Sequence, residues 1–148
     1  MELLIHPLSD KIGTTIPLPY YATDGAAALD LYACLDSDVV IAPHERVFLP
    51  TGIAVAIPEG YVGIMAVRSS MGAKHGINLA NGIGVIDSDY RGQLHVTLYN
   101  TTEQPYTVHS GDRVAQLMIM PVARPAIQVV DSLPKTERGT GGFGSTGR

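Results

Sequence analysis

Short apolar segments separated by turn-forming residues make up most of this chain. Ten prolines and sixteen glycines interrupt segments that are rich in Val, Ile, Leu and Tyr. Many short strands at such spacing are typical of a β-sandwich, a barrel or a jelly roll. We therefore predict an all-β fold, with strands at Leu3–His6, Ala27–Ala33, Val39–Ile41, Arg46–Leu49, Ile53–Ile57, Tyr61–Val67, Leu94–Asn100, Tyr106–His109, Arg113–Met120 and Ile127–Val130.

The same pattern predicts one short helix and one hairpin. The helix is expected at Ser70–His75, because no longer stretch repeats its apolar residues at helical spacing. Asn81–Gly92 (NGIGVIDSDYRG) starts with Asn-Gly and precedes a strand, which predicts a hairpin that bends after Ile86. Two carboxylates, a phenol and a guanidinium gather at this bend. Asp and Gly also occur in turns for conformational reasons, so this stretch alone leaves a purely structural role open.

Length and composition limit the classes of protein that fit. The 148 residues suit one compact domain. The net charge is −4 and no basic stripe is visible, which argues against a protein that binds long nucleic acid and favours a small anion as any anionic ligand. No apolar run approaches the ~20 residues of a membrane helix. The single cysteine, Cys34, excludes a disulfide within the chain and suits a reducing compartment, so we expect a cytoplasmic protein.

The last eighteen residues differ in composition from the rest. Residues 131–148 read DSLPKTERGTGGFGSTGR, and five of the sixteen glycines fall in the final ten positions around Phe143. Such composition does not form a packed core and is commonly a disordered tail. The alternative is an arm with a function, because the chain from Val130 to Phe143 can span roughly 40 Å at ~3.3 Å per residue. We accordingly divide the chain into a core, residues 1–130, and an arm that can reach another subunit.

Polar residues at three further places are candidates for binding a phosphate. Arg68, Ser69 and Ser70 stand where a strand ends and the short helix begins, although a serine there can be a simple cap. Gln116 lies on an otherwise apolar strand and needs a polar partner, which a structural hydrogen bond would also supply. Asp30 lies in an apolar strand too, and a buried carboxylate is costly unless a cation is near.

Other chemistries find less support in the sequence. Asp112 and Arg113 are adjacent and could form a local ion pair of little energetic weight. The five histidines show no spacing typical of a zinc site. Neither a G-x-S-x-G nucleophile elbow nor a P-loop occurs.

Five segments, taken in order, resemble the five motifs of the homotrimeric dUTP diphosphatases (dUTPases). They are AALDLYA, RSSMG, NGIGVIDSDYRG, GDRVAQ and RGTGGFGSTG, and together they cover nearly the whole chain. The chain departs from the family pattern at Ala28, where the first motif usually has Gly. The resemblance implies a jelly-roll β subunit in a trimer with three shared active sites. Each site would take the first, second and fourth motifs from one subunit, the hairpin from a second and the arm from a third.

The resemblance also implies a reaction and a set of residue roles. dUTP and water would give dUMP and pyrophosphate, with Mg²⁺ on the triphosphate and Asp87 as the general base that activates the water attacking the α-phosphorus. Asp30 would contact the metal through water. The phosphate ligands would be Arg68, Ser69, Ser70, Gln116, Arg138, Ser145 and Thr146. The uracil and deoxyribose ligands would be Asn81, Gly84, Val85, Ile86, Tyr90, His95, Phe143 and Gly144.

Two other functions remain as alternatives. A dCTP deaminase shares the fold of the dUTPases, but it lacks a glycine-rich arm with a Phe, and we find no Glu near the hairpin that is positioned to act as its base. The second alternative is a regulatory protein that uses nucleotide binding as a switch. No nucleic acid or membrane partner is expected in any of these readings.

Overall fold

The computed structural model describes residues 1–142 and confirms an all-β architecture with one short helix. Its elements are β1 (Leu4–Pro7), β2 (Leu29–Tyr32), β3 (Val39–Ile41), β4 (Arg46–Ala56), β5 (Tyr61–Val67), α1 (Ser69–His75), β6 (Ile77–Leu79), β7 (Gly84–Ile86), β8 (Gln93–Asn100), β9 (Tyr106–Val108) and β10 (Arg113–Pro121). Within the described residues, no helix is long and apolar enough to cross a membrane.

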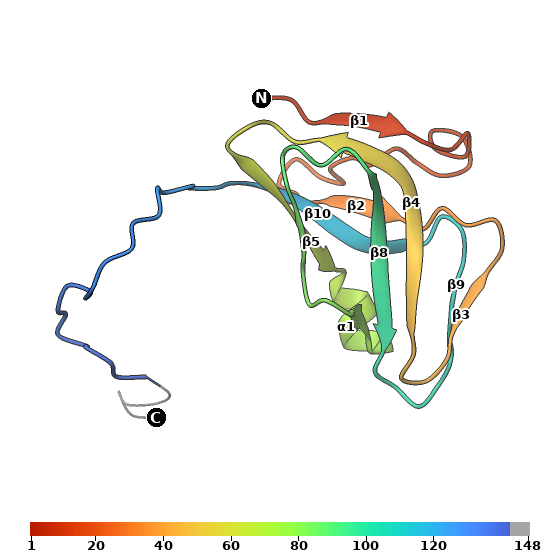
Figure 1. Ribbon diagram of the computed structural model, residues 1–148. Coiled ribbons are helices and arrows are strands. Elements are labelled where there is room, and N and C mark those ends of the chain that lie inside the picture. The colour runs from red at the N-terminus through yellow and green to blue at the C-terminus, as the bar shows by residue number, and fades with distance from the viewer. Residues whose placement is uncertain (143–148) are drawn as a thin grey trace.

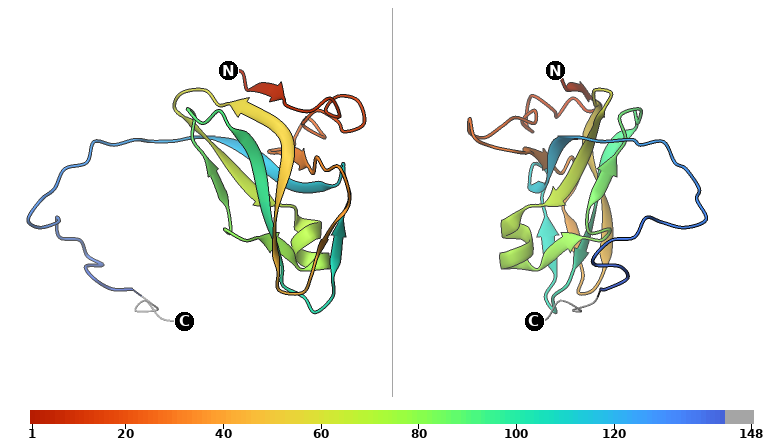
Figure 2. Two further views of the ribbon diagram at one scale, coloured as in Figure 1. Left: turned by 45° about the vertical axis from the view of Figure 1, so that its right-hand side comes forward. Right: turned by 90° about the vertical axis from the view of Figure 1, so that its left-hand side faces the viewer.

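Two antiparallel four-stranded sheets enclose the core (Figures 1 and 2). One sheet has the strand order β1-β4-β8-β6 and the other β2-β10-β5-β7, while β3 and β9 form a separate ribbon. Strand β8 shows how the sequence produces this arrangement, because buried and half-buried residues alternate along its whole length. Leu94, Val96 and Leu98 point inward and are at most 2% exposed. A period of two along a strand places one face on the core and the other towards the outside.

Strand β4 joins two segments that were predicted as separate strands. The break expected at Pro50–Gly52 is wrong, because the chain bends there without leaving the sheet. The pairing register between β4 and β8 shifts between Pro50 and Ala54, and Gly52 has φ +72 at the shift. A Cβ atom at Gly52 would lie 2.7 Å from Sγ of Cys34. Glycine therefore allows both the bend and the close packing of Cys34.

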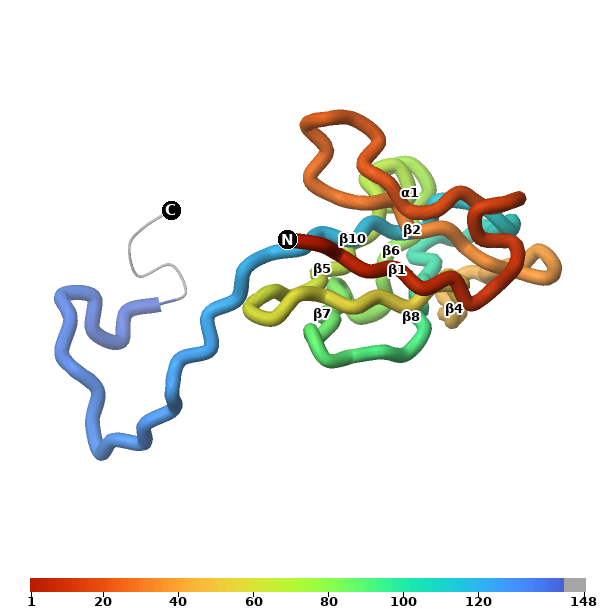
Figure 3. Tube along the Cα trace, turned by 90° about the horizontal axis from the view of Figure 1, so that it is seen from above, coloured from red at the N-terminus to blue at the C-terminus, as the bar shows by residue number. Residues whose placement is uncertain are grey.

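The predicted strand Ile127–Val130 is wrong. This segment lies on an extended arm that leaves the core after β10, as Figures 1 and 3 show. Ile127 and Val129 are 95% and 94% exposed. Their alternating apolar pattern resembles a strand, but a strand needs a neighbour, and none reaches the arm within one described chain.

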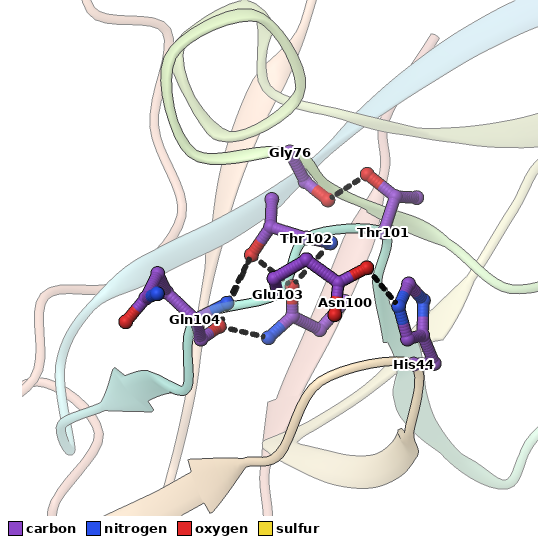
Figure 4. A network of polar contacts seen from close by, with 7 residues as sticks. All are labelled: His44, Gly76, Asn100, Thr101, Thr102, Glu103 and Gln104. Carbon is purple, nitrogen blue, oxygen red and sulfur yellow. Dashed lines mark hydrogen bonds and ion pairs between the residues drawn. The ribbon is translucent and has the colours of Figure 1, made fainter.

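The connection from β8 to β9 is held by a buried amide. Asn100 is fully buried, and its Nδ2 donates to the carbonyl oxygens of Ile41 and Gln104 at 3.1 and 2.7 Å. Its Oδ1 accepts from the backbone N–H and the hydroxyl of Thr102 (Figure 4). Every polar atom of the amide therefore has a partner, which removes the cost of burying it.

Candidate active site

Segment 81–92 crosses from one sheet to the other. β7 pairs with β5, whereas β8 pairs with β4 and β6, so the two strands do not form the paired hairpin that was predicted. The expected bend after Ile86 is present, but it connects the two layers of the sandwich. Within residues 1–142, β7 is also the last strand of its sheet, so one of its edges has backbone groups that no neighbouring strand pairs.

A cavity of about 260 Å³ lies beside this crossing. We call it the β7 cavity. Met65, Phe48 and Thr97 contribute to its walls. All six core residues predicted to bind uracil or deoxyribose also line it: Asn81, Gly84, Val85, Ile86, Tyr90 and His95. The structure therefore brings together positions that lie on β7, β8 and the two connections beside β7.

Tyr90 folds back against its own chain at the rim of this cavity. Its hydroxyl donates to the carbonyl oxygen of Gln93 at 3.1 Å. The ring passes directly over Gly92, where a Cβ atom would lie 2.3 Å from the Tyr90 hydroxyl oxygen and 2.6 Å from Cζ. Only a glycine at position 92 leaves room for this orientation of Tyr90.

His95 is fixed on three sides. Its Nδ1 lies 3.1 Å from the carbonyl oxygen of Gln93, and its Nε2 lies 3.1 Å from the Gln93 side-chain amide. Since a carbonyl can only accept, a neutral ring with its proton on Nδ1 satisfies both contacts. The ring also stacks on Phe48 with centroids 4.3 Å apart and planes inclined by 9°. Phe48 was not among the predicted site residues, because an apolar residue in a strand gives no signal of its own for a binding site.

Asp87 opens on a different cavity. Its side chain is exposed and borders an open hollow of about 700 Å³ together with Asp89, Arg91 and Arg124. Val85 borders both this hollow and the β7 cavity, so the two are neighbours across β7. Arg91 stabilises the turn by donating to the carbonyl oxygens of Ser88 and Tyr90 at 2.6 and 2.9 Å.

The expected phosphate-binding residues meet at the far strands of the same sheet. The carboxylate of Asp30 forms two ion pairs. One is with Nε of Arg68 at 3.0 Å, and the other is with Nη1 of Arg113 at 3.2 Å. The side chain of Asp30 is only 17% exposed, so the prediction that it needs a cation is confirmed. The expected pair between Arg113 and Asp112 is wrong, because Asp112 instead accepts from the backbone N–H of His109 at 2.8 Å.

Arg68 and Arg113 line a cavity of about 600 Å³, here called the arginine cavity. Ser70 and Tyr32 also border it. Burial raises the pKa of Tyr32, so its phenol stays neutral at this wall. Ser69 is the exposed first residue of α1.

Gln116 lies next to this group on β10. It is paired in register with Asp30 on one side and Ala66 on the other. Its side-chain amide donates to the carbonyl oxygen of Val67 at 3.4 Å, so the polar partner predicted for Gln116 is present.

Among residues 1–142, the β7 cavity and the arginine cavity have no lining residue in common. One chain therefore does not bring the predicted base-binding and phosphate-binding residues into a single pocket. Arg138 lies on the exposed arm, where its Nε donates to the carbonyl oxygen of Gly141 at 2.9 Å. Phe143, Gly144, Ser145 and Thr146 lie outside the described residues.

The described part of the chain provides no complete metal site. Residues 1–142 contain no group of three or more His, Cys, Asp or Glu side chains placed to hold an ion. Asp30 keeps lone pairs that a metal-bound water can use, although an arginine contacts each of its oxygens. This set suits Mg²⁺, which keeps several waters and is commonly held by one or two carboxylates plus substrate phosphates.

Comparison with known families gives the same assignment as the motifs. The dUTPase family model matches residues 14–147. The chain belongs to the dUTPase family. The resemblance predicted from the five motifs is therefore confirmed at the level of the whole chain.

Relatives and solved structures are similar to this dUTPase family member over nearly its full length. The deoxyuridine 5'-triphosphate nucleotidohydrolase of Tolumonas auensis is 49% identical over 142 residues, which cover 95% of this chain and 94% of that protein. A mutant dUTPase of Staphylococcus bacteriophage 80alpha with dUpNHpp has a TM-score of 0.88 and 27% identity, covering 99% of both chains. A mutant dUTPase of the S. aureus phage phi11, which reveals the coordination of a structural Mg(II) ion, has a TM-score of 0.80 and 25% identity over 91% of this chain and 100% of that one. These similarities confirm the jelly-roll fold.

Proposed function

We propose that this chain hydrolyses dUTP to dUMP and pyrophosphate, in trimers whose active sites combine residues of three subunits. The observation that carries the proposal is the β7 cavity, where six predicted nucleoside ligands from residues 81–95 line one small pocket. Family membership supplies the substrate class. The relatives named as deoxyuridine triphosphate nucleotidohydrolases support the same reaction.

Uracil binds along the unpaired edge of β7. Backbone N–H and C=O groups of Gly84, Val85 and Ile86 offer donors and acceptors in fixed positions, and the Asn81 side chain adds an amide. A cytosine would leave one of these groups without a partner, which costs ~1–3 kcal/mol for a buried group. Tyr90 lies against the deoxyribose and excludes a 2′-hydroxyl, while the backbone at His95 gives a further contact to the base.

The triphosphate lies against Arg68, Ser69, Ser70 and Gln116. Arginine is suited to this task because its planar guanidinium presents several donors to phosphate oxygens. Asp30 would hold Mg²⁺ through water, and the bound ion would offset part of the phosphate charge. The same charge would otherwise repel the carboxylate of Asp87.

Asp87 acts as the general base for the water that attacks the α-phosphorus. Its carboxylate is exposed at the end of β7, next to the β7 cavity rather than in it. This position suits a group that acts on a phosphate just outside the nucleoside pocket. A carboxylate there removes a proton from water as the new P–O bond forms, and the pyrophosphate leaves.

The separation of the two cavities supports an assembly of several subunits, and the resemblance to the dUTPases implies a trimer. Because none of residues 1–142 lines both, we expect a nucleotide held in the β7 cavity of one subunit to use the arginine cavity of another. The arm, residues 131–148, then closes the site from a third subunit. Arg138 contacts the γ-phosphate, Phe143 stacks on uracil with Gly144 beside it, and Ser145 and Thr146 donate to phosphates. A cytoplasmic location, which the single cysteine suits, belongs to the same proposal.

Pyrophosphate release from each common deoxynucleoside triphosphate tests the function. We expect release from dUTP in the presence of Mg²⁺, little from dCTP and dTTP, and a trimer by light scattering. Ammonia release from dCTP would instead support the deaminase alternative. A chain that is monomeric, or that leaves dUTP intact, would refute the proposal.

A further inference from the structure

A β-bulge in β10 turns Arg113 towards Asp30. The pairing of β10 with β2 places Gln116 opposite Asp30 and Ala115 opposite Leu31, but then Arg113 opposite Tyr32. Val114 is the extra residue at this register shift. In a regular strand Val114 would lie on the same face as Gln116, and Arg113 would point to the other face. The bulge therefore decides that Arg113 shares a face with Asp30 and Gln116.

Asp30 is the only carboxylate in contact with both arginines among the ion pairs of residues 1–142. Its two oxygens are divided between them, Oδ1 to Arg68 and Oδ2 to Arg113. Arg68 uses Nε, the nitrogen nearest its aliphatic stem, for this contact. A guanidinium bound through Nε keeps terminal donors for another partner. Arg68 and Arg113 both line the arginine cavity, so these donors are available to a ligand there.

We propose that Arg113 is a positioning residue for triphosphate binding, which holds Asp30 so that Asp30 orients Arg68 towards the phosphates. This inference rests on the proposed function and adds a residue to it. Without Arg113, one oxygen of a carboxylate that is largely shielded from water loses its cation. Asp30 can then rotate towards solvent, and Arg68 loses the fixed partner that sets the direction of its guanidinium.

A direct contact between Arg113 and the phosphates is the competing explanation. Arg113 is 47% exposed at its side chain, against 26% for Arg68, so it lies nearer the mouth of the cavity. The two explanations predict different effects on triphosphate binding when Arg113 and Asp30 are substituted together. A residue that acts through Asp30 loses its effect once Asp30 is changed, whereas a direct ligand does not.

The experiment compares Arg113→Gln, Arg113→Lys, Asp30→Asn and the double variant Asp30→Asn/Arg113→Gln in the full chain. Dissociation constants are measured for dUMP, which has no pyrophosphate tail, and for dUpNHpp. Arg46→Gln is the matched control, because Arg46 is an exposed arginine on the other sheet that lines neither cavity. Thermal unfolding and light scattering report on folding and assembly.

We expect Arg113→Gln to weaken dUpNHpp binding by about tenfold, the typical effect of losing a charged hydrogen bond, and to leave dUMP binding unchanged. Arg113→Lys keeps the charge but loses the planar fork, so its effect is intermediate. The double variant should bind dUpNHpp as Asp30→Asn does. The inference would be overturned if the double variant weakened dUpNHpp binding by the product of the two single effects. It would also be overturned if Arg113→Gln weakened dUMP and dUpNHpp binding equally. Normal dUpNHpp binding by Arg113→Gln in a chain that hydrolyses dUTP would refute this inference alone, whereas an inactive unaltered chain would refute the proposed function.

Discussion

Gly92→Ala tests whether the orientation of Tyr90 matters to the reaction. Gly92 does not have a positive φ, so the backbone accepts alanine and the effect comes from contact alone. The new methyl carbon would lie 2.3 Å from the Tyr90 hydroxyl oxygen, whereas non-bonded carbon atoms pack at about 3.5–4.0 Å. The phenol ring must therefore leave its present position beside the β7 cavity.

The cost to folding should be small and the cost to activity large. The displaced ring loses its hydrogen bond to Gln93, which contributes about 1 kcal/mol, and Tyr90 is already 46% exposed. We expect the melting temperature to fall by about 2–4 °C. Misplacing a substrate-positioning group by an ångström or more typically costs about 100-fold, so kcat/KM for dUTP should fall by about 10- to 100-fold. The value for UTP should fall less, because Tyr90 no longer excludes the 2′-hydroxyl.

Steady-state kinetics with dUTP and UTP measure this change. Gly25→Ala is the control, since a methyl group there meets nothing within 4 Å. On a Tyr90→Ala background, Gly92→Ala should have no further effect, because the clashing ring is gone. A Gly92→Ala variant with normal kcat/KM and unchanged discrimination against UTP would refute the role of Tyr90.

Three further predictions concern other parts of the molecule. Asp87→Asn should bind dUpNHpp with little change, while kcat falls by at least about 100-fold because an amide cannot accept the proton; near-normal turnover would remove Asp87 as the base. A chain ending at Lys135 should remain trimeric by light scattering but lose most of its activity, and full activity would show that the arm is dispensable. Asp38→Asn should lower the melting temperature below about pH 6.5 and have little effect at pH 9. The reason is that its hydrogen bond to His109 at 2.8 Å, aided by its charge, raises the pKa of that imidazole. This contact stabilises the fold below the pKa that His109 has in the unfolded chain, and the stabilisation is lost as the pH rises through the pKa of His109 in the folded protein. A difference in melting temperature that does not change with pH would contradict the pairing of Asp38 with His109.

Local patterns in the sequence determined most of the strands and the bend in segment 81–92, while the resemblance to the dUTPase motifs indicated six of the residues that line the β7 cavity. Alternating burial along β8 and the composition of segment 81–92 depend on neighbours in sequence, so both can be read from a few consecutive residues. The same local reasoning failed where a partner strand decides the outcome. Ile127–Val130 has the pattern of a strand but pairs with no strand among residues 1–142. Strand β4 continues through Gly52 because β8 pairs with it on both sides of the bend.

Only the tertiary structure decided how the polar residues combine. Nothing in the sequence next to Arg113 indicates that it pairs with Asp30, 83 positions away, rather than with its neighbour Asp112. That choice depends on one extra residue in β10, which reverses the face on which Arg113 lies. Likewise, the separation of the β7 cavity from the arginine cavity follows from the position of β7 at the edge of its sheet. Residue types thus determined which chemistry is possible, while strand register and sheet order, which depend on contacts between distant segments, decided which groups act together.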